Sequence, residues 1–559
     1  MMQAHLIEGS LYPIVVVKGK IPDQFFDILD GVSYRKKEHD GYDYFSFPFW
    51  HIERLSRFFG LPTNDYGKQL LRSLKEQEAI IKAVKTGNHP LIRQAPPYFY
   101  DHQKRAWALA VLCRTFAFYL EQGLGKTAIM IELMRIPSRR VPTLVVCPVT
   151  LIRGAWIPEL KLRAPELTIA NLHENPHFAL EHYDVYLLNK EKLSRNSAAF
   201  SQMMRHRVKR IIIDESSCMK NPEAKLTEGL HDFFGTIDER YLLSGTPAPN
   251  GPHEYWGQMH FLRPGLLPYT YKEYVDTYFT QKYRNKYVIR PGCIETVMDR
   301  ISSCSIAMKK DDCLDLPKKR FIPRFVTLPE DTRRAYNQLK ERLKQEIFEL
   351  RGQGKQTGSM FAQIMKLREI TSGFIVTHKK TSRFDAKTGS LVEDKESVWN
   401  FVSNHKFEML KELLEEIGNQ QVVIWMNFVK DFHLLSQLFP SLANRIGYIY
   451  GEVDNQEKRA NIIEAFRNGR LQYIAANPAS LGHGVTLINP VNPCSNVIYY
   501  DLDYSLEKFE QSQDRVHRIG QTRPVDYYAI LAEDTIDEAI WHRLAQKKEV
   551  LSDAMEYLK

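Results

Sequence analysis

Glu121-Gln122-Gly123-Leu124-Gly125-Lys126-Thr127 is the stretch that decides the fold, because of what stands on either side of it. It follows an apolar run, Phe116 to Leu120, and precedes a segment of helix-forming residues, Ala128 to Met134. A strand, a glycine-rich turn and a helix in this order are typical of a phosphate-binding loop, in which backbone N–H groups at a helix N-terminus converge on anionic oxygens. The stretch therefore predicts a phosphate site at the end of a strand.

Four residues of the stretch have distinct roles in such a loop. Gly123 and Gly125 permit the tight backbone, Lys126 reaches the β and γ phosphates, and Thr127 ligates Mg²⁺ through its hydroxyl. The match is Gly-x-Gly-Lys-Thr rather than the longer consensus, since Leu120 stands where that consensus has a small residue. The alternative interpretation is a helix cap followed by a surface lysine.

A second element downstream favours the phosphate site. Arg210-Ile211-Ile212-Ile213-Asp214-Glu215 is a β-branched run that ends in two carboxylates, the pattern of a buried parallel strand with acids at its carboxyl end. We expect Asp214 to hold Mg²⁺ through water and Glu215 to polarise the attacking water. A buried strand with a solvated acidic end is the alternative. The phosphate loop and the acidic pair occur together in the chain order that nucleotide hydrolases have, and this favours nucleotide hydrolysis.

The composition fixes the broad class. The chain has 559 residues, 43% of them hydrophobic, and this length predicts about three or four domains. Neither a membrane span nor a secretory leader is visible, so we expect a cytoplasmic or nucleoid-associated protein, or one of the host cytoplasm if it is viral. The seven cysteines lack the spacing of zinc or redox pairs. The formal net charge of +9 favours a polyanionic partner.

Strand-like apolar runs alternate with helical patterns in two separate blocks. This alternation predicts an α/β fold with two parallel, helix-flanked sheets. The first block contains the runs 116–120, 143–148, 184–189, 211–215 and 241–245. The second contains the runs 421–427, 446–451, 471–477, 496–501 and 525–531. Since only the first block carries a phosphate loop, we expect it to bind the nucleotide.

The segment between the blocks, residues 263–400, is rich in helix formers and charge. Within it, the polar run from His378 to Glu396 predicts a loop or a partly mobile insertion. The tyrosines from Tyr269 to Tyr287 favour a buried helix face, with base stacking as the alternative. After the second block, residues 534–557 predict an amphipathic helix that braces it.

The second block ends in an arginine-containing segment, Gln511 to Gln521. Arg515 and Arg518 stand three residues apart, which predicts that they share one helical face. From such a face both guanidinium groups would reach the charge that develops on a γ-phosphate during its transfer. A solvated, arginine-rich helix is the alternative.

In their chain order these motifs resemble those of helicase superfamily two. The series comprises Glu121 to Thr127, Asp214-Glu215, Leu243-Ser244-Gly245-Thr246-Pro247 and Gln511 to Gln521. The ending His517-Arg518-Ile519-Gly520-Gln521 is similar to that of the Swi/Snf-type DNA translocase branch, and further matches cover nearly all of residues 98–550. Within this branch, Ser480 to Gly484 resembles versions in phage and mobile-element proteins.

The resemblance implies two RecA-like parallel-sheet lobes with helical insertions, and a small N-terminal α+β module. It places the accessory module at residues 1–95 and the ATP-binding lobe 1 at residues 96–262. A helical insertion and linker would follow at residues 263–400, and lobe 2 with its C-terminal brace helix would occupy residues 401–559.

The resemblance also implies which residues bind and react. ATP and Mg²⁺ are the implied ligands, and Gln103 would read the adenine. Residues around the nucleotide would be Gln103, Gly123, Gly125, Lys126, Thr127, Gly484 and Gln511. Thr150, Lys190 and Thr486 would contact the nucleic-acid backbone. Catalysis would depend on Lys126, Asp214, Glu215, Arg515 and Arg518, with Thr127 and Asp214 at the metal.

Two positions depart from the family's pattern. Ser216-Ser217 follows the acidic pair, where the family usually has a small residue and a histidine. Tyr504-Ser505-Leu506 stands where a Trp-Asn-Pro usually follows a late aspartate. The first change removes a side chain that often couples hydrolysis to the other lobe, so we expect the coupling route, and not the ATPase, to differ.

The N-terminal 95 residues carry basic and aromatic residues side by side. The segments Val15 to Lys18, Phe26, Tyr34 to Lys37, Tyr42 to Phe49 and His51 to Phe59 predict a strand, a helix, two strands and a helix. This order resembles the substrate-recognition modules ahead of the motor in annealing helicases of the same branch, which act on forked or branched DNA. A structural cap on lobe 1 is the alternative.

The resemblance implies an ATP-dependent DNA translocase that remodels branched or forked DNA by branch migration, fork regression or reannealing, in repair, recombination or replication. Double-stranded DNA is the implied partner, no membrane is expected, and protein partners are left open. One alternative is a helicase that separates strands, for which we expect a strand-splitting element. The other is a nucleic-acid-binding scaffold without chemistry, against which the intact Lys126, Asp214, Glu215 and both arginines argue.

Overall fold

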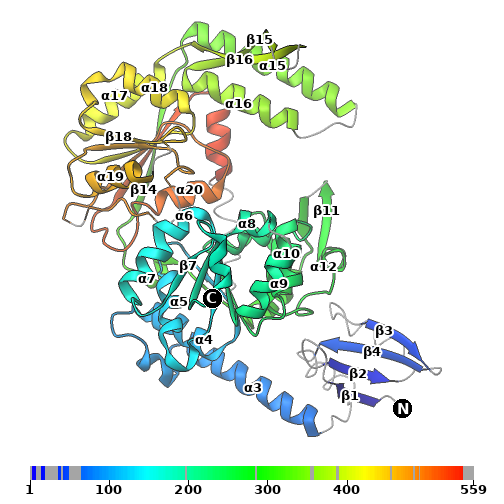
Figure 1. Cartoon of the computed structure of the whole chain (residues 1–559). Helices are drawn as coiled ribbons and strands as arrows, with labels where there is room; N and C mark the ends of the chain where they lie inside the picture. Colours follow the sequence, from blue (N-terminus) through cyan, green and yellow to red (C-terminus); the bar gives the residue numbers. More distant parts are fainter. Residues whose placement is uncertain are drawn as a thin grey trace. The chain divides into compact units, whose positions relative to one another are not determined.

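A computed structural model describes residues 3–7, 14–18, 35–39, 42–48, 65–195, 198–283, 286–352, 358–385, 390–453, 456–481, 485–489 and 491–544. These residues fall into two compact units, unit 1 up to Asp315 and unit 2 from Leu316 onward (Figure 1). Each unit is built on its own parallel sheet. Among the described residues, no helix is both long and apolar enough to cross a membrane.

Unit 1 contains, within its described part, a seven-stranded sheet of order β13-β5-β10-β9-β6-β8-β7 in which every neighbouring pair is parallel. The strands are β5 (Thr115–Leu120), β6 (Thr143–Cys147), β7 (Ile169–Asn171), β8 (Val185–Asn189), β9 (Arg210–Asp214), β10 (Glu239–Leu243) and β13 (Ser305–Met308). All five predicted strands of the first block are confirmed. The strands β7 and β13, which are short and lie at the two edges of the sheet, were not predicted.

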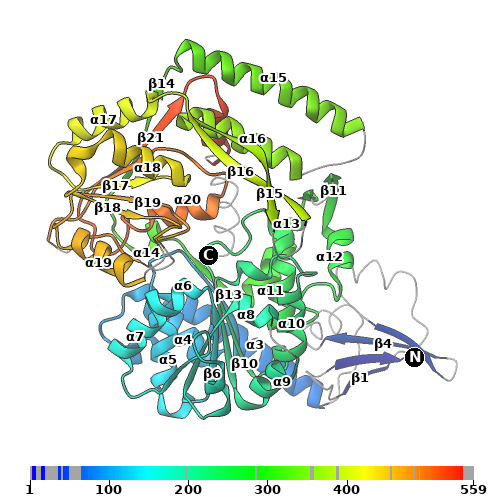
Figure 2. The same cartoon turned by 45° about the horizontal axis from the view of Figure 1, so that its top comes forward.

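Helices cover both faces of this sheet (Figure 2). One core packs the sheet against α4 (Asp101–Leu112), α5 (Lys126–Arg135) and α7 (Ile157–Arg163). The other packs it against α8 (Lys190–Arg195), α9 (Ala198–Arg207), α10 (Lys225–Phe234), α11 (Tyr255–Leu262), α12 (Tyr271–Tyr278) and α13 (Cys293–Ser302). In β5, Phe116 and Phe118 face the first core while Ala117 and Tyr119 face the second, as a strand buried on both sides requires.

Further described elements of unit 1 include α3 (Asp65–Lys85), α6 (Val149–Leu151), α14 (Lys310–Cys313) and the strand pair of β11 (Phe279–Tyr283) and β12 (Lys286–Ile289). In the tyrosine-rich segment, Tyr274 and Tyr278 of α12 are buried in the second core. The prediction that these tyrosines form a buried helix face is confirmed for this pair.

The N-terminal region contains an antiparallel sheet of order β1-β2-β4-β3. Its strands are β1 (Gln3–Ile7), β2 (Ile14–Lys18), β3 (Arg35–His39) and β4 (Tyr42–Pro48). The three predicted strands are confirmed, and β1 was missed. The segments predicted as helices, around Phe26 and from His51 to Phe59, lie outside the described residues.

Unit 2 contains, within its described part, a six-stranded parallel sheet of order β14-β21-β20-β17-β19-β18. The strands are β14 (Lys319–Val326), β17 (Val422–Trp425), β18 (Ile446–Ile449), β19 (Tyr473–Ala476), β20 (Asn496–Tyr499) and β21 (Val525–Ala532). The five predicted strands of the second block are confirmed. The missed strand, β14, contains Pro323 and lies at the sheet edge, where a residue without an N–H is tolerated.

The described helices of unit 2 include α15 (Glu330–Gly352), α16 (Gly358–Ser372), α17 (His405–Ile417), α18 (Val429–Leu438), α19 (Gln456–Arg467) and α20 (Leu506–Gln513). Residues of α15, α16, α17 and α18 form a common core with one face of the sheet. Of the predicted C-terminal brace helix, residues 536–544 are helical and the rest lie outside the described residues.

The expectation that the polar run from His378 to Glu396 forms a loop is wrong. Most of the run lies in an antiparallel hairpin of β15 (Phe374–Asp385) and β16 (Ser390–Phe401), paired in register from Phe374 opposite Phe401 to Asp385 opposite Ser390. A polar sequence does not exclude such a ladder, because its hydrogen bonds are made by backbone groups.

Candidate functional site

The phosphate loop of unit 1 connects β5 to α5. Gly125 precedes the first residue of α5 with φ 85° and Gly123 has φ 87°, both in the left-handed region that glycine enters without strain. Lys126 begins the helix, and its Nζ donates hydrogen bonds to the carbonyl oxygens of Leu120 (2.7 Å) and Glu121 (3.4 Å). The ammonium therefore lies over the loop, where a helix N-terminus also favours an anion.

Gln103 is fixed against this loop. It lies near the start of α4, and its side chain is buried. Its Oε1 accepts from the backbone N–H of Tyr100 at 3.1 Å, and its Nε2 donates to the carbonyl oxygen of Leu124 at 3.1 Å. The structure thus brings this residue to the phosphate loop, and its reading of adenine stays a prediction.

Asp214 stands at the carboxyl end of β9 and is buried. Its Oδ2 accepts from the indole Nε1 of Trp156 at 2.9 Å, and its Oδ1 accepts from the backbone N–H of Glu215 at 3.0 Å. Burial raises the pKa of Asp214, while the Lys126 ammonium and the Trp156 hydrogen bond oppose that rise. The structure therefore brings the predicted lysine and the predicted aspartate into one electrostatic site.

Glu215 completes the acidic pair in an unusual backbone conformation. Its φ of 55° lies in the left-handed region, although it is not a glycine, and its side chain is buried. Such backbone strain is found at functional sites where the surroundings hold it in place. This left-handed conformation ends the extended backbone of β9 directly after Asp214.

Thr127 and Asp214 fit the Mg²⁺ role assigned to them. Mg²⁺ prefers oxygen ligands and is usually held by one or two carboxylates together with substrate phosphates, not by a dedicated protein cage. Among the described residues no cluster of three or more His, Cys, Asp and Glu side chains could hold a metal. The Thr127 hydroxyl and the Asp214 carboxylate, beside a phosphate loop, match a site in which a few protein oxygens hold Mg²⁺ together with the substrate phosphates.

The two predicted nucleic-acid residues of unit 1 follow neighbouring strands. Thr150 lies in α6 directly after β6, and Lys190 is the first residue of α8 directly after β8. Both are partly exposed. Because all strands are parallel, these residues lie at the same edge of the sheet as the phosphate loop and the acidic pair.

Arg515 and Arg518 of unit 2 do not share a helical face, so that expectation is wrong. Helix α20 ends at Gln513, and both arginines lie in the turns that follow. Arg515 is buried and donates through Nη1 to the carbonyl oxygen of Val485 at 3.2 Å, whereas Arg518 is partly exposed. Tertiary contacts of the turn therefore replace the helical geometry that the spacing predicts.

The other predicted residues of unit 2 lie nearby in the chain. Gln511, in the last turn of α20, is buried. Thr486 is partly exposed and neighbours Val485 and Leu487, and the Leu487 N–H donates to the Arg515 carbonyl oxygen at 2.9 Å. The structure thus joins the Thr486 segment to the Arg515 segment. Gly484 lies outside the described residues.

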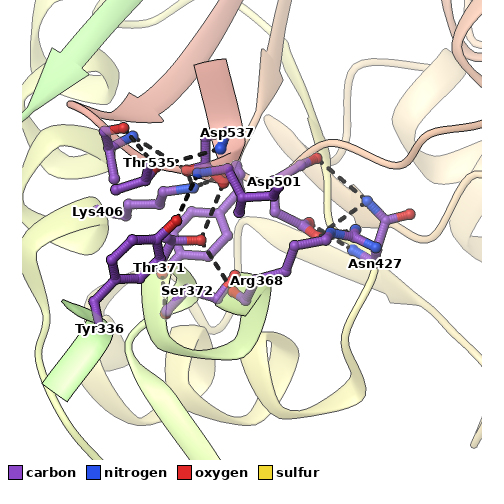
Figure 3. A network of polar contacts seen from close by, with 12 residues as sticks. Tyr336, Arg368, Thr371, Ser372, Lys406, Asn427, Asp501, Thr535 and Asp537 are labelled. Carbon is purple, nitrogen blue, oxygen red and sulfur yellow. Dashed lines mark hydrogen bonds and ion pairs between the residues drawn. The ribbon is translucent and has the colours of Figure 1, made fainter. Parts of the chain in front are cut away.

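A buried polar network in unit 2 joins α16 and α17 to the segments that follow β17, β20 and β21 (Figure 3). Arg368 of α16 donates through Nη2 to Oδ2 of Asp501, which follows β20, at 3.1 Å. Asn427 also donates to Asp501, from its backbone N–H at 2.8 Å and from its side chain. Lys406 of α17 pairs with Asp537 at 2.6 Å. None of these contacts is apparent in the sequence, because each joins elements far apart in the chain.

The comparisons with known proteins agree with the two sheets. The sequence matches the model of the SNF2-related domain over residues 102–373 and that of the helicase conserved C-terminal domain over residues 405–520. A solved Sulfolobus solfataricus SWI2/SNF2 ATPase core in complex with dsDNA has a TM-score of 0.37 and 24% identity, covering 81% of this chain and 92% of that one.

Curated relatives include cellular and phage proteins. An uncharacterized ATP-dependent helicase of Mycoplasma genitalium is 25% identical, with 82% of this chain and 42% of the relative covered. A human SWI/SNF-related, matrix-associated, actin-dependent regulator of chromatin is 25% identical, with 86% and 46% covered. A putative protein of an Acyrthosiphon pisum secondary endosymbiont phage is 24% identical, with 78% and 93% covered. The chain thus spans less than half the length of the two cellular relatives.

The two family models together cover more than two thirds of the chain. The first spans the strands of the unit 1 sheet together with β14, and the second spans β17 to β20 of the unit 2 sheet. The chain therefore belongs to the Swi/Snf-type branch of helicase superfamily two, whose SNF2-related domain and helicase conserved C-terminal domain it carries in this order.

Proposed function

We propose that the chain hydrolyses ATP in response to DNA and uses the cycle to move along the duplex and remodel branched or forked DNA. The observation that carries this proposal is the convergence of the Lys126 ammonium, the buried Asp214 carboxylate and the glycine-rich loop at one edge of the unit 1 sheet. Thr150 and Lys190 at the same edge favour coupling to a nucleic-acid backbone.

The chemistry follows from the positions of these groups. The N–H groups at the start of α5 and the Lys126 ammonium bind the phosphates. Thr127 and Asp214 would hold Mg²⁺, which supplies charge stabilisation to the phosphoryl group when bound. Glu215 orients the attacking water, and Trp156 keeps the Asp214 carboxylate in place through its N–H. Arg515 and Arg518 would stabilise the charge that develops in the transition state.

Binding to DNA should be insensitive to sequence and weakened by salt. Backbone contacts of the kind assigned to Thr150, Lys190 and Thr486 carry no base code, and each neutralised phosphate releases counterions. The net charge of +9 agrees with an anionic partner. Such a protein would act wherever its DNA lies, in the cytoplasm or the nucleoid, in repair, recombination or replication.

A strand-separating helicase is the second candidate, and one observation favours it. The β15–β16 hairpin is a long two-stranded element in unit 2, of the kind that could divide two strands of a duplex. A catalytically silent scaffold is disfavoured, because Lys126, Asp214, Glu215 and both arginines are all present.

The test compares the full chain on linear duplex, single-stranded and forked DNA. We expect ATP turnover to rise with duplex DNA, to rise further with forked DNA, and to be accompanied by reannealing without release of strands from a blunt duplex. Strand release from the blunt duplex would support the helicase instead. Turnover that is equal with and without DNA would contradict both.

A further inference from the structure

Gln258 is a polar residue in the middle of a buried, largely apolar helix. It lies in α11, Tyr255–Leu262, and is fully buried. A buried side-chain amide costs free energy unless its hydrogen-bonding groups are satisfied. We therefore expect the Gln258 amide to have hydrogen-bond partners, and these partners indicate its role.

The partners of Gln258 come from segments of three neighbouring strands. Its Oε1 accepts from Ser216 Oγ at 2.8 Å and from Tyr119 Oη at 3.2 Å, and its Nε2 donates to the Pro247 carbonyl oxygen at 2.8 Å. A carbonyl oxygen only accepts, so the contact with Pro247 fixes which end of the amide carries the nitrogen. All three bonds are satisfied in a single orientation.

These partners belong to the segments that carry the proposed chemistry. Ser216 directly follows Glu215, and Tyr119 immediately precedes Leu120, whose carbonyl oxygen accepts from Lys126. Strands β5, β10 and β9, from which the three segments emerge, are adjacent in the sheet. One amide thus joins the acidic segment, the strand before the phosphate loop and the segment after β10.

The segment after β10 also lies against the phosphate loop. A Cβ added to Gly245 would meet the Gln122 side chain at 3.1 Å and its backbone nitrogen at 3.2 Å. The segment that contains Gly245 and Pro247 therefore lies close beside the phosphate loop at one point and is hydrogen-bonded to Gln258 at another. Through Gln258 it is tied to Ser216 and so to the acidic pair.

We infer that Gln258 is a positioning residue that holds the acidic pair in register with the phosphate loop for ATP hydrolysis. This inference rests on the proposed function. Glu215 has strained backbone that its surroundings must maintain, and the Ser216 hydroxyl is the first side-chain anchor after it. Since a misplacement of about 1 Å can cost on the order of a hundredfold in rate, this anchor governs turnover more than nucleotide affinity.

The three hydrogen bonds of Gln258, to Ser216, Tyr119 and Pro247, are called the Gln258 junction. The test uses Ser216→Ala, which removes one hydrogen-bond donor without adding bulk, and Gln258→Leu, which removes all three hydrogen bonds. Ser305→Ala is the matched control, because Ser305 in unit 1 is equally buried and donates to the Ile301 carbonyl oxygen at the same 2.8 Å, away from the acidic pair. Turnover at saturating DNA, KM for ATP and thermal unfolding are measured for the full chain.

We expect Ser216→Ala and Gln258→Leu to lower kcat by about tenfold or more with KM changed by less than about twofold. The double variant should be no slower than the slower single variant, since both remove one junction. Ser305→Ala should keep the wild-type kcat. If Gln258→Leu does not fold, Ser216→Ala decides. Equal kcat values for Ser216→Ala and Ser305→Ala would overturn the inference alone, whereas a wild type without DNA-stimulated turnover would overturn the proposed function and the inference with it.

Discussion

Arg368 of α16 and Asp501 at the end of β20 form an ion pair of 3.1 Å whose side chains are only 5% and 3% exposed. The pair joins α16 to the carboxyl edge of the unit 2 sheet, a few residues before α20 and the arginine-containing turns begin. Burial raises the pKa of Asp501, and the Arg368 guanidinium lowers it. The ion pair therefore ties α16 to the segment that leads to Arg515.

Loss of one partner of this pair leaves the other charge buried. We expect Arg368→Ala to lower the free energy of unfolding by about 3–5 kcal/mol, because the buried Asp501 carboxylate then loses its ion-pair partner and keeps only the Asn427 hydrogen bonds and the attraction of Lys406. Calorimetric unfolding measures the effect. Arg334→Ala is the control, since Arg334 makes an exposed pair with Asp331 and its loss should change little. Equal unfolding temperatures for the two variants would contradict the role of the pair.

Asp431 gives a dependence of stability on pH. It is fully buried, and its carboxyl oxygens have no hydrogen-bond partner among the described residues. Burial and the nearby Asp501 raise the pKa of Asp431 well above its ordinary value, against the opposing charges of Lys406 and Arg368. A raised pKa means that the folded state keeps this proton up to a higher pH than the unfolded chain does.

The sign of the effect follows from this proton. The free energy of unfolding of the wild type should fall as the pH rises above the ordinary aspartate range, because deprotonation favours the unfolded state. Asp431→Asn removes the cost of deprotonating the buried carboxyl, so its advantage in stability over the wild type should grow as the pH rises above the ordinary aspartate range, as measured by denaturant titrations at a series of pH values. Asp331→Asn, at an exposed position, should show no such trend. A difference between Asp431→Asn and the wild type that does not change with pH would contradict the raised pKa.

Trp156 should affect how ATP turnover depends on pH on the acid side of the pH–rate profile. Its indole N–H lowers the pKa of Asp214, so Trp156→Phe should raise that pKa, shift the acid limb of the pH–rate profile to higher pH and increase the Mg²⁺ concentration needed for half-maximal turnover. Trp256→Phe is the control, because Trp256 donates to the Pro268 carbonyl oxygen and not to a catalytic acid. If both variants keep the wild-type pH profile, the hydrogen bond has no catalytic role.

Gly125 should not tolerate a side chain. Its φ of 85° strains any other residue, and a Cβ there would collide with the Gln103 side chain. We expect Gly125→Ala to weaken ATP binding by roughly tenfold or more, measured by nucleotide titration. Gly87→Ala is the control for backbone strain without a side-chain collision, because Gly87 has φ 83° but nothing within 4 Å of the added Cβ. Since Gly87 lies outside the phosphate loop, its replacement should leave nucleotide affinity unchanged. Equal nucleotide affinity for Gly125→Ala and the wild type would show that the loop does not bind the phosphates.

The sequence predicted the parts of the fold that depend on local pattern. The β-branched run before Asp214 and the apolar run before the phosphate loop were found because strands buried on both faces are continuously hydrophobic. Strand β14 escaped because its edge position tolerates Pro323 and charged residues, and the β15–β16 hairpin escaped because its ladder is made by backbone groups. In both cases tertiary pairing overrode composition.

In the candidate site, too, the sequence predicted those residues that stand in a local motif. Lys126, Thr127 and Asp214 stand in motifs whose spacing carries their chemistry. The hydrogen bond from Trp156 to Asp214 and the junction at Gln258 join segments separated by 58 and 42 residues, respectively, so no local pattern reveals them. The one available signal for Gln258 was an amide within an otherwise apolar helix.

DNA-stimulated ATP turnover by Lys126→Ala, compared with the wild type and with Lys161→Ala at an exposed position of α7, tests the proposed chemistry most directly. We expect Lys126→Ala to lose roughly a hundredfold or more of the turnover while DNA binding is retained, because the ammonium that stabilises the phosphates is gone. Lys161→Ala should turn over ATP at the wild-type rate. Undiminished, DNA-stimulated turnover in Lys126→Ala would contradict an ATPase centred on this loop.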